Sequence, residues 1–108
     1  MEEPRDDAAV LVAVAVRYGL TQEKIARHVG VAQSTVSRWR NGEALIYLWE
    51  FRSFSTLLGL SSAESLRMVD AVWGATEAAM SASPVPLDRL TTMQAVVRGS
   101  DPRTWGQG

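Results

Sequence analysis

The segment QSTVSRWRN, residues 33–41, holds side chains of the types that form hydrogen bonds with the edges of nucleic-acid bases. On a helix, where successive residues turn by about 100°, Val36 and Trp39 define one buried side. The side chains that point away from it or project from the N-terminal end are Gln33, Ser34, Ser37, Arg38 and Asn41. A guanidinium suits O6 and N7 of guanine, and a Gln amide suits N6 and N7 of adenine. We therefore predict base contacts by Gln33, Ser34, Ser37 and Arg38, the alternative being a solvated face of an ordinary helical bundle.

Two short helices joined by a tight turn are needed to hold this face outward. Thr21 is a suitable N-cap for a helix over residues 22–29, and Gly30-Val31-Ala32 interrupts it. A second helix is predicted over residues 33–40, ending at the turn pair Asn41-Gly42. Half-buried Thr35 would support this second helix.

The apolar and small residues of this segment fit a close crossing of the two helices. Such a crossing needs a small residue at the contact and a turn residue that adopts positive φ, and Ala26 and Gly30 stand at these places. Ile25 and Val29 line the inner side of the first helix, and Val31 fills the turn. The spacing therefore predicts a helix-turn-helix.

Residues 20–42, LTQEKIARHVGVAQSTVSRWRNG, closely resemble the helix-turn-helix of the phage repressor and Cro family of bacterial transcription regulators. Looser similarity reaches Gly59-Leu60-Ser61, which resembles the junction of the family's fourth and fifth helices. The resemblance implies an all-α fold, a five-helix repressor/Cro-like helix-turn-helix domain, here with an additional C-terminal helix. It also implies that the third of the five helices lies in the DNA major groove. Ala32 departs from the family, which often has a Ser or Thr cap there. Residues after about Met80 lie outside the resemblance.

Seven residues are candidates for contacts with the DNA backbone. Gln22 begins the first helix of the pair, where free backbone N–H groups attract phosphate, and the resemblance implies the same contact. For Asn41, the resemblance implies a phosphate contact rather than a base contact. Arg40 lies to the side of the base-reading face, where it either reaches a flanking phosphate or pairs with Glu43. Basic side chains that either contact the backbone or are merely solvated are Arg17, Lys24, Arg27 and Arg52.

Helices are also predicted on both sides of this pair. Asp6 or Asp7 as N-cap and Gly19 as the closing residue favour a helix up to Tyr18, although its alternating valines also fit a strand. Further helices are predicted over residues 47–58, from the capping box Ser61/Glu64 to about Met80, and over residues 87–99 after a proline-rich break. The predicted organisation is an acidic lead (1–7), a helix-turn-helix DNA-binding domain (8–81), a C-terminal helix with a role in dimerisation (82–99) and a flexible tail (100–108).

Four aromatic residues are predicted to lie in the core: Trp39, Trp49, Phe51 and Phe54.

The apolar residues of the second half exceed what one packed face requires. Residues 62–81 show one broad apolar stripe (Leu66, Val69, Val72, Trp73, Thr76, Met80) and a second face of smaller residues (Met68, Ala71, Ala75, Ala78, Ala79). The second face needs a cover, which is either the last helix, with Leu87, Leu90, Met93 and Val97 on one side, or a second copy of the chain.

Charge and composition narrow the function classes. The 108 residues carry a net charge of −1, but residues 8–60 hold six basic and three acidic side chains. A polyanion is therefore expected to bind the first half of the chain. The chain has no Cys, which excludes zinc-thiolate sites, and its one His, His28, is expected to be exposed. It also has no grouping of side chains that suggests catalysis. We therefore expect a protein that is not an enzyme and that holds no metal and no cofactor. The longest apolar run is far shorter than the roughly 20 residues of a membrane span, which predicts a cytoplasmic protein without membrane contact.

These patterns predict a sequence-specific DNA-binding transcriptional regulator, a repressor or Cro-like protein that reads the major groove with residues 33–41. One such helix specifies only a few base pairs, so we expect a homodimer on a palindromic operator of double-stranded DNA, with its contact within residues 62–98. Two alternatives share the same DNA module: an antitoxin that binds a protein partner through residues 62–98, and an architectural DNA-binding protein of a mobile element.

Overall fold

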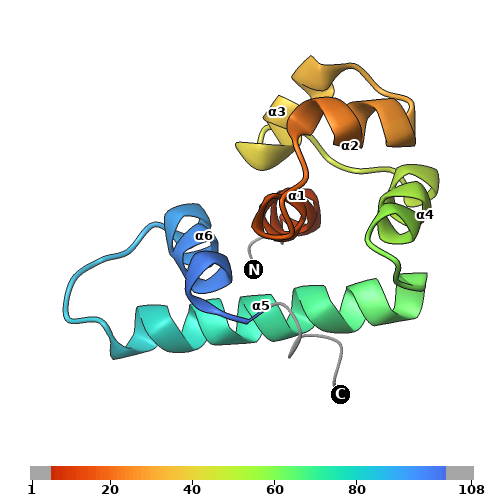
Figure 1. The fold of residues 1–108 in the computed structure, drawn as a ribbon. Helices are drawn as coiled ribbons and strands as arrows, with labels where there is room; N and C mark the ends of the chain where they lie inside the picture. Colours follow the sequence, from red (N-terminus) through yellow and green to blue (C-terminus); the bar gives the residue numbers. More distant parts are fainter. Residues whose placement is uncertain (1–5, 102–108) are drawn as a thin grey trace.

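The chain folds as α-helices without a strand over residues 6–101, the part that this computed structural model describes (Figure 1). The helices are α1 (Asp7–Arg17), α2 (Gln22–Val29), α3 (Gln33–Arg40), α4 (Leu48–Leu57), α5 (Ser62–Ala82) and α6 (Arg89–Gly99). The all-α class with an additional C-terminal helix is therefore confirmed. Most of the expected acidic lead (1–7) and of the expected tail (100–108) lies outside the described residues. No helix within the described range is long and apolar enough to cross a membrane.

Helix α1 lies at the centre and packs against four other helices: α2, α3, α5 and α6. Seven of its eleven residues are buried, on every side of the helix. A helix that is apolar all round belongs in an interior, which explains why its valines alternate without forming a strand. The strand alternative is therefore wrong. Asp6 occupies the N-cap position without a side-chain capping bond, and Gly19 has the positive φ of 89° that a helix-closing turn requires.

Residues 20–42, which we call the recognition unit, fold with the predicted helix bounds. The hydroxyl of Thr21 accepts a hydrogen bond from the N–H of Lys24 at 3.2 Å, which caps α2. Gly30 ends α2 in the left-handed conformation with a φ of 85°. Because an L side chain rarely adopts this φ, glycine is what permits the sharp turn into α3. The buried side chains of the two helices are Ile25, Ala26, Val29, Val36 and Trp39.

Helix α4 corrects one prediction about the aromatic residues. Phe51 and Phe54 are buried, but Trp49 is 57% exposed, so its predicted place in the core is wrong. On a helix, Trp49 stands about 200° from Phe51 and 140° from Phe54, and so points away from the side that packs. The carboxylate of Glu50 accepts a hydrogen bond from the N–H of Tyr47 at 2.8 Å, which fixes the start of α4.

Helix α6 folds back against α5 and α1 (Figure 1). Met93 and Val97 are at most 1% exposed, and the guanidinium of Arg89 lies 5.5 Å from the ring centroid of Trp73 on α5. The helix begins at Arg89 rather than at Leu87, because the carboxylate of Asp88 caps it by accepting from the N–H of Thr91 at 3.0 Å. Helix α6 thus covers one side of α5 but leaves Ala71, Ala75 and Ala78 exposed, and Met93 and Val97 are not free to contact a second copy.

The buried side of α5 also differs in part from the predicted stripe. Its buried residues are Ser65, Met68, Val69, Val72, Trp73 and Thr76. Leu66 is 46% exposed and Met68 is buried, so these two were assigned to the wrong faces. Ala71, Ala75, Ala78 and Ala79 are exposed. The capping box at the start of α5 is confirmed, since Ser61 and Glu64 exchange hydrogen bonds of 2.9 and 3.1 Å.

Candidate nucleic-acid interface

The predicted base-contacting side chains all lie on α3. Gln33, Ser34 and Arg38 are exposed, and Ser37 is half-buried. On the opposite side of the same helix, Val36 and Trp39 are completely buried. The helix therefore presents a polar surface with a guanidinium, an amide and hydroxyls, the donors and acceptors that match base edges.

Trp39 holds α3 and the loop that follows it. Its ring lies 6.2 Å from that of Phe54, centroid to centroid, with the planes inclined at 45°. Its indole N–H donates a hydrogen bond to the carbonyl of Leu45 at 3.2 Å. This side chain is thus a core residue, as predicted from its register, and it also fastens the loop between α3 and α4.

The first turn of α3 has no side-chain cap. Ala32 occupies the N-cap with extended backbone, φ −70° and ψ 149°, and offers no side-chain acceptor. In contrast, the first turn of α2 is capped by Thr21. The backbone N–H groups at the start of α3 therefore receive no side-chain acceptor from the N-cap residue.

The candidate phosphate contacts occupy the two ends of the recognition unit. Gln22 is half-buried in the first turn of α2, and Lys24 is exposed in the same turn. Arg40 ends α3, and Asn41 follows as its C-cap; both are exposed. Arg40 forms no ion pair with Glu43 in the part of the chain that the structure describes, so the predicted alternative of a pair is absent there.

Two further basic candidates have partners in the fold. The guanidinium of Arg27 pairs with the carboxylate of Glu23 at 2.7 Å, one helical turn away. The Nε–H of Arg17 donates a hydrogen bond to the carbonyl of Ser100 at 3.3 Å, which links the end of α1 to the end of α6. His28 and Arg52 are exposed, as expected for solvated side chains.

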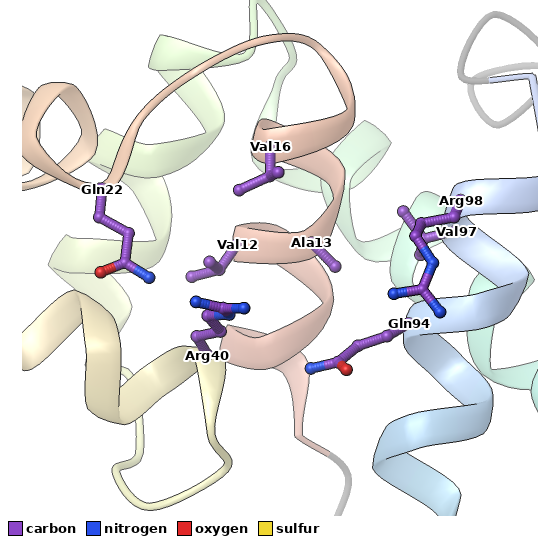
Figure 2. Close-up of a pocket in the computed structure, with 8 residues that line it drawn as sticks. All are labelled: Val12, Ala13, Val16, Gln22, Arg40, Gln94, Val97 and Arg98. Carbon is purple, nitrogen blue, oxygen red and sulfur yellow. The ribbon is translucent and has the colours of Figure 1, made fainter.

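A pocket of about 310 Å³ lies between the recognition unit, α1 and α6 (Figure 2). It brings together two of the predicted phosphate contacts, Gln22 and Arg40, with two residues that sequence reasoning missed, Gln94 and Arg98. Both missed residues lie on α6, outside the resemblance, and only the fold-back of α6 places them beside the recognition unit. No signal in the sequence around them indicates this proximity.

One carboxyl group lies beside the turn that follows α3. A Cβ built on Gly42 would lie 3.0 Å from Oδ2 of Asp6, so this side chain packs against the turn. Partial burial, with the neighbouring charge of Asp7 as a second cause, raises the pKa of Asp6 above its ordinary value.

Among residues 6–101, no group of three or more His, Cys, Asp or Glu side chains is placed to hold a metal ion.

Comparison with known proteins finds a family model that is similar to part of the chain. The profile of a protein family described as Helix-turn-helix matches residues 13–46, which run from the middle of α1 to the loop before α4. No curated protein and no solved structure shows significant similarity to the chain. The matched segment contains the whole recognition unit and the outward polar side of α3. The match over residues 13–46 supports a DNA-binding helix-turn-helix of the Cro/C1 type in this part of the chain.

Proposed function

We propose that the protein is a sequence-specific transcriptional regulator, a repressor or Cro-like protein, which reads the DNA major groove with α3. In this proposal Gln33, Ser34, Ser37 and Arg38 contact base edges. The backbone phosphates are contacted by Gln22, Lys24, Arg40 and Asn41. The observation that carries the proposal is the division of α3 into a fully buried apolar side, Val36 and Trp39, and an opposite polar side, within a helix-turn-helix.

The proposed regulator acts as a homodimer on a palindromic operator. One α3 specifies too few base pairs to select a single genomic site, so two half-sites about 10 base pairs apart are needed. Within residues 62–98, α6 has its apolar side chains against its own chain, and the exposed side of α5 remains. That side carries Ala71, Ala75 and Ala78, and we place the dimer contact there.

The antitoxin alternative draws no support from the fold. Met93 and Val97 lie inside the chain's own core, so a protein partner, like a second copy of the chain, would have to use the exposed side of α5, and no feature of that side favours a different protein. The architectural alternative shares the DNA module with the regulator and differs only in the role of the bound site.

Selection of bound duplexes from a random DNA pool with the purified full chain tests the proposal. The expected result is a palindromic motif with half-sites about 10 base pairs apart. A transcription assay on a promoter that contains this motif then distinguishes a repressor from an architectural protein, since only the former lowers transcript levels. Retention of DNA without any enriched motif would contradict sequence-specific regulation.

A further inference from the structure

The pocket between the recognition unit and α6 has an apolar floor and polar walls from two separate parts of the chain. Its floor consists of Val12, Ala13, Val16 and Val97. Figure 2 shows Gln22 and Arg40 converging on one side of α1, while Gln94 and Arg98 approach α1 from the other side. Four side chains with N–H donors therefore line this pocket, and no single element supplies them.

The charge of this pocket is uncompensated. Its lining contains two guanidinium groups, Arg40 and Arg98, and no carboxylate. Neither guanidinium forms an ion pair or a hydrogen bond within residues 6–101. Guanidinium groups present N–H donors in a planar fork that matches the oxygens of a phosphate, and amide donors add to such a site. The chemistry of the lining is therefore that of a site for a phosphate group.

The wall formed by α6 is held in place by several contacts. Met93 and Val97 are buried against the rest of the chain, and the guanidinium of Arg89 lies over the ring of Trp73. Close to the pocket, the hydrogen bond from Arg17 to the carbonyl of Ser100 ties α6 to α1. Arg98 stands two residues before this bond, so the position of its backbone relative to α1 is fixed by the fold.

We propose that Gln94 and Arg98 complete a phosphate-binding site with Gln22 and Arg40, and that its occupant is a backbone phosphate of the DNA that α3 reads. The proposal rests on the proposed function, because Gln22 and Arg40 belong to the recognition unit and the pocket opens at the edge of that unit. Helix α6 then has two roles: it covers the core of α1 and α5, and it extends the DNA contact beyond the helix-turn-helix.

The salt dependence of DNA affinity tests this site. Titrations of the selected duplex compare the full chain with Arg98→Gln and with the control Arg52→Gln, which removes the same charge from an exposed position of α4. Loss of one phosphate contact reduces the slope of log affinity against log salt by about 0.9. Because the proposed homodimer carries this contact twice, the affinity advantage of the unaltered chain over Arg98→Gln should shrink about 12-fold between 50 and 200 mM salt. The control should retain the slope of the unaltered chain.

Two further variants separate this role from a structural one. Arg98→Lys keeps the charge and should restore most of the slope, whereas Gln94→Leu should weaken binding without changing the selected motif. Thermal melting of each variant shows whether α6 remains folded. Equal salt slopes for Arg98→Gln and the unaltered chain would overturn the proposal.

A free phosphorylated molecule is the other source of the same chemistry, and inorganic phosphate serves as its probe. Saturable stabilisation of the unaltered chain by millimolar phosphate, absent in Arg98→Gln, combined with equal DNA slopes, would place a small molecule in the pocket and overturn the DNA assignment. Failure of the unaltered chain to select any motif is a different result, since it refutes the proposed function itself and the DNA phosphate with it.

Discussion

The recognition unit and the C-terminal pair α5–α6 achieve stability by different means. In the recognition unit, a cap at Thr21, a left-handed Gly30 and a few inner side chains lie within about 20 residues of one another. In the C-terminal pair, α6 depends on α1, whose residues are some 80 positions earlier in the chain, through contacts such as that of Arg17 with Ser100. Local contacts fix the shape of a short motif, whereas the fold-back of α6 is decided by the whole core.

The largest expected effect concerns the anchor of the recognition unit. Trp39→Ala should lower the free energy of unfolding by about 3–5 kcal/mol, because it empties a fully buried site and leaves the carbonyl of Leu45 without its donor. Trp49→Ala is the matched control, and its loss should be much smaller because Trp49 is largely exposed. Denaturant unfolding measures both. Similar losses for the two tryptophans would contradict the packing described for α3 and α4.

A second substitution weakens the C-terminal pair instead. Met93→Ala should cost about 2–3 kcal/mol, near the lower end of the range for buried Met, since α6 lies at the edge of the core and can shift toward the gap. Met93→Leu, which conserves volume, should cost less than about 1.5 kcal/mol. Hydrogen exchange should show faster opening of α6 in Met93→Ala while α2 and α3 remain protected. Uniform loss of protection would mean that the two regions unfold as one unit.

The same contrast explains which features the sequence could predict. The bounds of α2 and α3 follow from Thr21, Gly30 and the Asn41-Gly42 turn, which act on neighbouring residues. The errors at Trp49, Leu66 and Met68 arose where residues on two sides of a helix are both apolar, because the partner of each side is then decided by distant segments. For the same reason Gln94 and Arg98 could not be assigned to the site from sequence. The predicted roles of individual residues on α3 rest on its outward face.

A third change compares how the two regions contact DNA. Arg38→Ala should lower specific affinity by about 1–3 kcal/mol and relax the preference at one base position in each half-site, since α3 presents this guanidinium outward. Arg98→Gln should leave the selected motif intact. Site selection with both variants measures the difference. An unchanged motif for Arg38→Ala would remove this residue from the base-reading role.

A fourth, smaller effect is expected from pH, because the two regions are capped by different groups. Hydrogen bonds from the hydroxyl and the N–H of Thr91 lower the pKa of Asp88, the N-cap of α6. A carboxyl with a lowered pKa in the folded state stabilises it above the ordinary pKa, and this contribution is lost as the pH falls through the lowered value. Asp88→Asn should therefore flatten the acid side of the stability profile, which thermal melts between pH 2 and about 6 would show. Part of the slope should persist, since Glu64 at the start of α5 also has a lowered pKa. Thr21→Ser, at the uncharged cap of α2, should leave the profile unchanged.

The smallest expected effect is a gain at the uncapped start of α3. Ala32→Ser should raise the free energy of unfolding by a few tenths to about 1 kcal/mol, because a hydroxyl at this extended N-cap can accept from the free N–H groups of the first turn. The matched control is Ala79→Ser, at an exposed interior position of α5, where serine lowers helix propensity and should cost up to about 0.5 kcal/mol. Thermal melts at one pH compare the two. A gain at position 32 with a loss at position 79 identifies capping as the cause, because the same chemical change then acts in opposite directions. An unchanged or lower midpoint for Ala32→Ser would mean that another group already satisfies the start of α3, so that its positioning depends on the core beneath Val36 and Trp39 rather than on a local cap.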